Sequence, residues 1–235
     1  RRLLGYTAAR AHHAEIGGIA PGSMAPEAST LAEEGVVIRP VRLGDARRVD
    51  WDAARALFST GPHPSRDPAT NARDLAAAAH AVWAGADALR SLGESMGPDA
   101  FAGLSRVIRL RAAERAREAI LAIPDGVYEH SEPVRGGGPI VVRITIASDR
   151  ATVDFTGTGP VHAACLNATP AIVTSAVVYL LRVLVDEDLP LNEGLLEPVT
   201  LHIPRGMLNP QFAQDAVACP AVAGGNVEIS QLVVE

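Results

Sequence analysis

The amino-acid sequence predicts an α+β protein with mixed sheet and hairpin regions, an inserted two-helix hairpin and a buried helix in its C-terminal part. Three observations predict this class: helical spacing of apolar residues over 71–123, alternation of apolar and polar residues over 140–155, and a nearly unbroken apolar run over 171–185. We expect three regions: 1–45, the remainder of an N-terminal site region; 46–124, a helical hairpin region; and 125–235, an α+β C-terminal region.

The first 45 residues predict short extended segments on either side of a turn. Residues 1–10 are typical of the end of a strand and its connection, and residues 36–43 (VVIRPVRL) of a short strand with Pro40 at an edge or bulge. Between them, the glycines and the proline of IGGIAPGS can adopt the backbone angles that turns require. We therefore expect a loop at residues 16–23.

Two helices are predicted between residues 71 and 123. Asn71 is a candidate N-cap, apolar residues then recur at alternating spacings of four and three, and Gly93 is expected to end the first helix. Pro98 suits the first position of the second helix, whose polar face is rich in arginine. Such a face is usually solvated, and it can also meet an acidic partner subunit. The short connection at 93–98 predicts an antiparallel hairpin.

The C-terminal region predicts a β-hairpin and a buried helix. Every second residue from Ile140 to Ile146 is apolar, Ser148 and Asp149 suit a turn, and Val153 faces the same core on the return strand. The apolar run at 171–185 is too apolar for a surface helix, so we expect it to be buried. The remaining segments are a strand at 198–203 and the stretch 224–231, for which strand and helix both remain open.

Composition excludes several classes of protein. The 235 residues are 48% hydrophobic and 20% charged, as in ordinary globular proteins, and 21 cations against 27 anions give a net charge of −6 with no lysine, so nucleic acid and anionic membrane are not expected partners. Cys165 and Cys219 stand far apart and predict free, buried thiols in a reducing compartment. The longest apolar run falls short of the roughly 20 residues that span a bilayer, so we expect a soluble, cytoplasmic protein.

The stretch from Arg10 to Ser23 (RAHHAEIGGIAPGS) holds the densest group of candidate site residues. Imidazole and carboxylate groups suit a borderline divalent metal, and glycines let backbone approach a ligand closely. Successive side chains of an extended segment point to opposite faces, so His12 and His13 cannot both face one ion, and strand parity pairs His13 with Glu15. The alternative interpretation is a polar strand end or a hydrogen-bonded core histidine, which short motifs often prove to be.

This stretch resembles the AHHADIGG-x-x-PGS signature of the hydantoinase B/5-oxoprolinase family, which includes N-methylhydantoinase and acetone carboxylase subunits. Three further segments resemble family segments in the family's order: VDFTGTGP at 153–160, LPLNEGLLEPV at 189–199 and GGNVEISQ at 224–231. The resemblance therefore runs from about the first residue to the last, and several separate matches are far more specific than one motif.

The resemblance implies that His12, the first histidine of the AHH segment, is a ligand of a divalent metal (Mn, Zn or Fe), with His13 turned away. Glu15 stands where the family usually has Asp and is a candidate catalytic or outer-shell carboxylate. The family's other ligands lie in a GGTHLPD-like segment before this stretch, which these residues lack, so we expect an N-terminal portion to be missing. The remaining candidates are His13, Gly17, Gly18, Asn226 and Glu228 as site-lining residues and Asp154 as a catalytic group.

Asp154 is a candidate because strand parity turns its side chain to the face opposite the core, although a solvated strand face explains it equally well.

The resemblance also implies an activity. We expect the metal-bearing subunit of an ATP-dependent hydrolase of cyclic amides (hydantoin, 5-oxoproline or a lactam), in a hetero-oligomer with a hydantoinase A-like subunit that uses the ATP. The chain itself contains no GxxxxGK[ST] loop. The alternatives are a subunit of an ATP-dependent carboxylase of ketones such as acetone or acetophenone, and a non-catalytic remnant or structural subunit.

Overall fold

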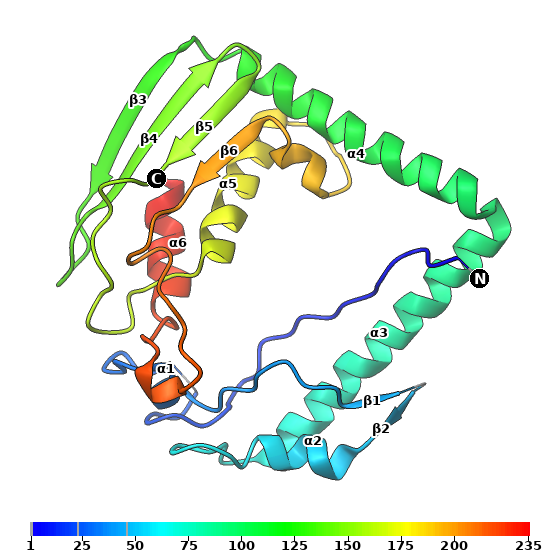
Figure 1. Ribbon diagram of the computed structural model, residues 1–235, viewed down its shortest axis with the longest axis vertical. Coiled ribbons are helices and arrows are strands. Elements are labelled where there is room, and N and C mark those ends of the chain that lie inside the picture. The colour runs from blue at the N-terminus through cyan, green and yellow to red at the C-terminus, as the bar shows by residue number, and fades with distance from the viewer. Residues whose placement is uncertain (1, 23, 46) are drawn as a thin grey trace. The chain divides into compact units, whose positions relative to one another are not determined.

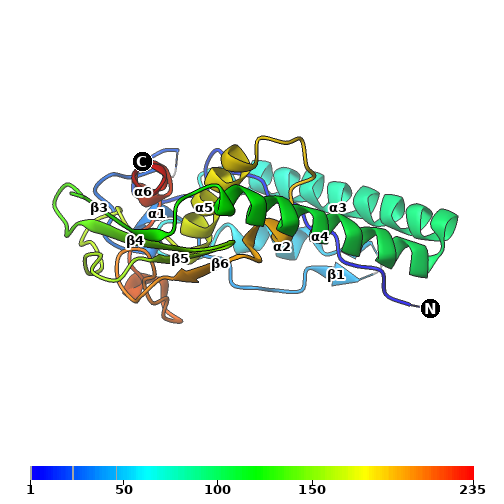
Figure 2. The ribbon, with the colours of Figure 1, turned by 90° about the horizontal axis from the view of Figure 1, so that it is seen from above.

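The computed structural model describes residues 2–22, 24–45 and 47–235, and the chain divides into two compact units, residues 1–104 and residues 105–235. Helices and a mixed four-stranded sheet make up most of the regular structure, which confirms the predicted α+β class (Figures 1 and 2). Within the described ranges, no helix combines the length and the apolar character needed to cross a membrane.

The first unit contains one long helix with short elements beside it. The strands expected at 1–10 and 36–43 are not found in residues 2–10 or 36–43. A strand forms only where a neighbouring edge supplies its hydrogen bonds. Here Thr7 instead donates its hydroxyl proton to the carbonyl oxygen of Val82 at 2.9 Å, so side chains hold this segment to the long helix. The elements are α1 (Leu31–Glu34), β1 (Gly44–Asp45), β2 (Arg48–Val49), α2 (Trp51–Leu57), α3 (Pro68–Met96) and the start of α4 (Pro98–Leu121).

Both ends of α3 differ from the expected positions. The N-cap is Asp67, four residues before the expected Asn71, because Asp67 accepts a hydrogen bond from the backbone N–H of Thr70 at 3.0 Å and a proline occupies the first helical position. It continues past Gly93, where a Cβ would lie 2.2 Å from a methyl carbon of Leu4. Gly93 therefore makes room for a neighbour, and the helix ends at Gly97, whose φ is +83°.

The second predicted helix is confirmed as α4, and no residue between 104 and 119 lies in a strand. The two units meet within this helix, so antiparallel packing of α3 and α4 remains a prediction. The arginine face of α4 pairs with carboxylates of its own unit. Glu187 binds Arg111 and also Arg115, the latter at 2.7 Å, and Glu197 binds Arg109.

The second unit is built on a sheet with strand order β3-β4-β5-β6, in which β5 and β6 are parallel and the other neighbours antiparallel. The predicted hairpin is confirmed, with Ser148 at φ +57° in its turn and Ile144 opposite Val153. The strand β3 was not expected, because residues 126–132 carry no clear alternation of apolar residues. The strands are β3 (Gly126–Glu132), β4 (Ile140–Ala147), β5 (Arg150–Asp154) and β6 (Val199–His202).

One face of this sheet is covered by α5, with α6 beside it (Figure 1). Helix α5 is buried on one side only, and Tyr179 and Val183 on its other side remain 60% and 58% exposed. A helix that packs on a single sheet has only one side to bury. The helical and 3₁₀ segments are α5 (Pro170–Val185), η1 (Glu193–Leu196), η2 (Ala216–Ala218) and α6 (Gly225–Val234). The core comprises Ile120, Ile146, Ala151, Val177 and Leu181.

The buried loop that carries Asn167 packs against the start of α6 in this unit. Asn167, fully buried, accepts a hydrogen bond from the backbone N–H of His162 at 2.7 Å, and its amide nitrogen lies 2.9 Å from the carbonyl oxygen of Ala221. A Cβ on Gly225 would lie 1.9 Å from the carbonyl oxygen of Asn167. Only glycine therefore fits at the start of α6, which is helical where the sequence left strand and helix open. Cys165 and Cys219 are buried thiols that form no disulfide within the described part of the chain, as predicted.

Candidate functional site

The two adjacent histidines have different surroundings, both in the first unit. His12 is exposed, whereas His13 is half-buried with its ring edge-on to Phe58 at a centroid distance of 5.5 Å. The Nδ1 atom of His13 lies 3.4 Å from a carboxylate oxygen of Asp74 on α3. Residues 11–17 form no strand, yet the two side chains still differ in direction: His12 is exposed to solvent, whereas His13 is directed into the unit.

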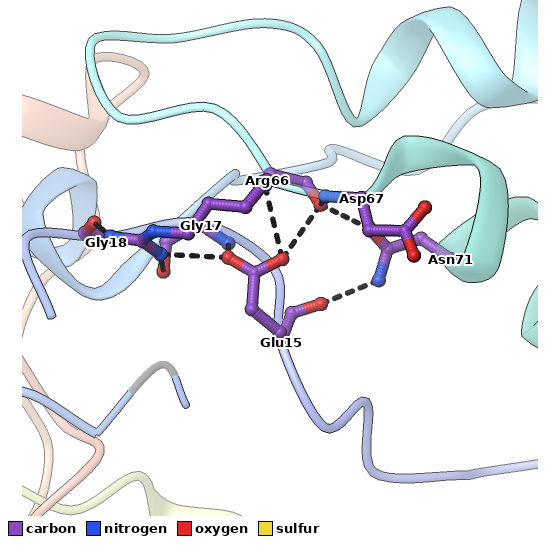
Figure 3. Close-up of polar contacts among 7 residues, drawn as sticks. Glu15, Gly17, Gly18, Arg66, Asp67 and Asn71 are labelled. Carbon is purple, nitrogen blue, oxygen red and sulfur yellow. Dashed lines mark hydrogen bonds and ion pairs between the residues drawn. The ribbon is translucent and has the colours of Figure 1, made fainter. Parts of the chain in front are cut away.

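Glu15 is the centre of a hydrogen-bond network that joins this segment to the residues before α3. Its carboxylate accepts hydrogen bonds from the backbone N–H of Gly17 at 2.6 Å, the hydroxyl of Ser65 at 2.8 Å and the guanidinium of Arg66 at 2.8 Å. The backbone N–H of Arg66 adds a fourth at 3.2 Å. Figure 3 shows the Glu15 carboxylate beside Arg66 and the backbone of Gly17. The two carboxylate oxygens are thus already engaged by the protein.

This network favours the ionised form of Glu15. Partial burial acts to raise the pKa of Glu15, but the hydrogen bonds from Ser65, Gly17 and Arg66 together outweigh it, so the pKa lies below its usual value. A carboxylate in this state is a poor proton donor near neutral pH. The geometry therefore favours a role in holding the loop, and catalysis by Glu15 remains a prediction.

Gly17 and Gly18 need to be glycine because of the protein's own backbone. Their φ angles are +94° and +88°, and both residues are buried. A Cβ on Gly17 would lie 2.2 Å from the carbonyl oxygen of His63, and one on Gly18 2.7 Å from that of Glu34. The sequence suggested approach to a ligand, whereas the close approach observed is to other parts of the chain. Their role in lining a site remains a prediction.

Asp154 ends β5 in the second unit. Its carboxylate accepts hydrogen bonds from the hydroxyl of Thr156 at 2.6 Å and from the backbone N–H of Thr156 at 2.8 Å. These contacts outweigh the opposing effect of burial and hold the pKa of Asp154 below its usual value. Such a turn orders the end of the strand by itself, so the local geometry requires no catalytic role.

Asn226 and Glu228 lie on α6. Residues two apart in a helix are separated by about 200°, so these side chains do not share the face that an extended segment would give them. Asn226 shares a face with Ser230, and it lines a surface hollow that has no lining residue in common with the hollow beside Asp154. Asp154 and Asn226 therefore line different hollows, and their roles in a site remain predictions.

The described residues place no cluster of candidate metal ligands around His12. Across residues 2–22, 24–45 and 47–235, no group of three or more His, Cys, Asp or Glu side chains could hold an ion. His12 is exposed, and its role as a metal ligand remains a prediction.

Three contacts were not predicted from the sequence: that of Arg66 with Glu15, that of Asn71 with the backbone of Glu15, and that of Asp74 with His13. The amide of Asn71 donates to the carbonyl oxygen of Glu15 at 2.5 Å, so this buried residue holds the loop and does not cap a helix. One signal was present in the sequence. Asp67 followed by Pro68 marks a helix start, which places Arg66 and Ser65 at the end of a connection, where side chains can reach another loop.

Comparison with known proteins places these observations in a family context. The pattern that defines the hydantoinase B/oxoprolinase family matches residues 1–235. 5-Oxoprolinase 1 of Arabidopsis thaliana is 32% identical over 262 residues, which cover 100% of this chain and 20% of that protein. The B-type subunit of a putative D-/L-hydantoinase from Pseudomonas sp. (strain NS671) is 27% identical over 238 residues, covering 92% of this chain and 39% of the relative.

The fold has a close counterpart among solved structures. The ATP-dependent caprolactamase from Pseudomonas jessenii superposes with a TM-score of 0.73 at 24% identity, covering 87% of this chain and 36% of the other. At that identity the likeness shows the fold alone. The chain spans about a fifth of the length of the Arabidopsis relative and about two fifths of the Pseudomonas hydantoinase relative.

Proposed function

Because this chain belongs to the hydantoinase B/oxoprolinase family, we propose that it is part of an ATP-dependent enzyme that opens a cyclic amide such as hydantoin, 5-oxoproline or a lactam. The observation that carries the proposal is the match of the family over the full chain, including the segment in which the exposed His12 precedes a loop fixed by Glu15. Relatives named as a 5-oxoprolinase and as the B-type subunit of a hydantoinase support a hydrolase of cyclic amides.

The proposal divides the reaction between two subunits. An amide carbon is a poor electrophile, and transfer of a phosphoryl group from ATP to the amide oxygen by a hydantoinase A-like partner subunit would activate it. Water would then add to that carbon, the ring C–N bond would break with protonation of the nitrogen, and a second water would release the phosphoryl group as phosphate. These 235 residues contain no phosphate-binding loop of the GxxxxGK[ST] type, in agreement with ATP being used by the partner. We expect the purified chain without its partner to hydrolyse no ATP above background.

Metal binding is a separate part of the proposal and depends on His12. The exposed imidazole would supply one ligand of a divalent ion (Mn, Zn or Fe), and the proposal places the other donors in the GGTHLPD-like segment that carries the family's remaining ligands. Within this chain, the role of the neighbouring residues is to orient His12. The ring of His13 packs edge-on to Phe58, with its Nδ1 atom 3.4 Å from the Asp74 carboxylate.

The test uses the complete protein together with its partner subunit. Turnover of hydantoin, 5-oxoproline and caprolactam is measured with ATP, with and without bicarbonate, alongside metal content. His12→Ala should lower turnover on the order of 100-fold or more and remove bound metal, whereas His13→Ala should have a milder effect. Full metal content in the His12→Ala protein would contradict the ligand assignment. Turnover of a ketone that requires bicarbonate would assign the carboxylase alternative, and no ATP-dependent turnover would assign a structural subunit.

A further inference from the structure

Arg66 makes a set of contacts that no other described side chain of the first unit duplicates. One guanidinium nitrogen donates to the Glu15 carboxylate at 2.8 Å and to the carbonyl oxygen of Gly17 at 3.3 Å, and another donates to the carbonyl oxygen of Gly18 at 2.8 Å. One planar group therefore binds a side chain and two successive peptide carbonyls of the same loop (Figure 3). We name Glu15, Ser65, Arg66 and Asn71 the loop clamp.

From this arrangement we infer that Arg66 is a positioning residue, which fixes the loop at Gly17 and Gly18 and thereby the direction in which His12 faces. The inference rests on the function proposed above for His12. Each carbonyl that Arg66 binds belongs to a peptide next to a residue with positive φ, so rotation of either peptide would break a hydrogen bond to the guanidinium.

The clamp is continuous with the segment that carries His12. The amide of Asn71 holds the carbonyl oxygen of Glu15 at 2.5 Å, and the carbonyl oxygen of Ile16 accepts from the backbone N–H of Val36 at 2.9 Å. His13 is held by Phe58. The exposed His12 thus directly precedes a segment anchored at successive positions, and its side chain leaves that segment toward solvent.

The contacts of Arg66 go beyond a single surface ion pair. Its side chain is 44% exposed and that of Glu15 22%, a setting in which a single ion pair contributes little to stability because solvent screens it. A fork that binds three oxygens at once adds geometric constraint, which a lysine ammonium cannot reproduce because its charge is compact and its stem is flexible. Loss of Arg66 should therefore affect the position of the loop more than the stability of the fold.

The experiment compares Arg66→Gln, Arg66→Lys and the control Arg73→Gln in the complete protein. Arg73 lies on α3 with its guanidinium 2.7 Å from the hydroxyl of Thr70, so its replacement removes the same charge without touching the loop. The readouts are the Kd for Zn²⁺ and Mn²⁺, kcat and KM for the cyclic amide, hydrogen exchange of the backbone at residues 12–18, and Tm.

Arg66→Gln should weaken metal binding and lower kcat by about 10–100-fold, with faster exchange confined to residues 12–18, as expected for a group that orients a ligand. Arg66→Lys should recover only part of the loss, and Arg73→Gln should match the wild type. Unchanged Kd and kcat in Arg66→Gln, whatever the change in Tm, would overturn the inference and leave Arg66 a purely structural role.

Failure of the proposed function is distinguishable from failure of this inference. If the wild type opens no cyclic amide but binds metal, the Kd of the Arg66 variants still decides. If the wild type neither opens a cyclic amide nor binds metal, hydrogen exchange decides. Exchange at residues 12–18 that is the same in Arg66→Gln as in the wild type overturns the inference. Faster exchange at residues 12–18 in Arg66→Gln, with unchanged exchange in the interior of α3, supports it.

Discussion

Two glycine pairs, Gly17–Gly18 in the first unit and Gly224–Gly225 in the second, lie close to distant parts of the chain for different physical reasons. Gly17 and Gly18 have φ of +94° and +88°, whereas Gly224 is helical at −66° and Gly225 begins α6. The first pair is held by side chains that remain partly exposed, whereas in the second pair the backbone N–H of Gly225 donates to the carbonyl oxygen of Cys165 at 2.9 Å. The first pair therefore needs glycine for both conformation and space, and the second for space.

The largest expected effect is that of Gly225→Ala. The added Cβ would lie 1.9 Å from the carbonyl oxygen of Asn167, in a buried region where the backbone on both sides is fixed by hydrogen bonds. We expect a loss of at least about 3 kcal/mol in the free energy of unfolding, measured by denaturant titration. The control is Gly103→Ala on α4, where nothing lies within 4 Å and the helix should gain up to about 1 kcal/mol. Equal stabilities of the two variants would contradict this account of the second pair.

A smaller effect is expected from Gly18→Ala. Comparison with Gly22→Ala separates the cost of the positive φ from the cost of contact between the added Cβ and distant backbone. Both residues have positive φ, but a Cβ on Gly18 would lie 2.7 Å from the carbonyl oxygen of Glu34, whereas nothing lies within 4 Å of one on Gly22. We expect losses of about 2 kcal/mol and about 1 kcal/mol, respectively, in the free energy of unfolding. A larger loss for Gly22→Ala would show that crowding by the distant backbone does not matter.

The smallest effect concerns pH and affects only the first pair. The pKa of Glu15 is lower in the folded protein than in an ordinary glutamate. The ionised carboxylate therefore contributes its full stability when the pH is above the ordinary glutamate pKa, and this contribution is lost as the pH falls through the lower folded-state pKa. Hydrogen exchange at Gly17–Gly18, corrected for intrinsic rates, should accelerate below about pH 5, while exchange at Gly225 should not.

Glu15→Gln is the matched variant for this pH effect. It should remove the acceleration at Gly17–Gly18, because the amide side chain has no charge to lose. Glu94→Gln, which replaces an exposed carboxylate on α3, should retain it. Acceleration of equal size at Gly18 and Gly225 would show that acid acts on the whole protein and not on the loop clamp.

Local patterns predicted the elements whose signal is complete within a short window. The β4–β5 hairpin follows from strict alternation, and α4 from a proline at its first position and a continuous apolar stripe. The signal was incomplete for β3, which has little alternation, and for residues 2–10, whose extended character had no partner strand to complete it. Gly93 was misread as a helix end because packing against Leu4 cannot be inferred from its neighbours in sequence.

The sequence by itself determined the α+β class, the two long helices, the family and, through the family resemblance, the choice of His12 as the candidate ligand to test. Tertiary structure alone decided that Arg66 and Asn71 hold the segment after His12, that α6 is a helix, and that Gly17 and Gly225 are crowded by backbone elsewhere in the chain. The reason is distance along the chain. Periodicity and capping involve residues a few positions apart, whereas Glu15 meets Arg66 across an interval of 51 residues, and only the path of the folded chain brings them within hydrogen-bond distance.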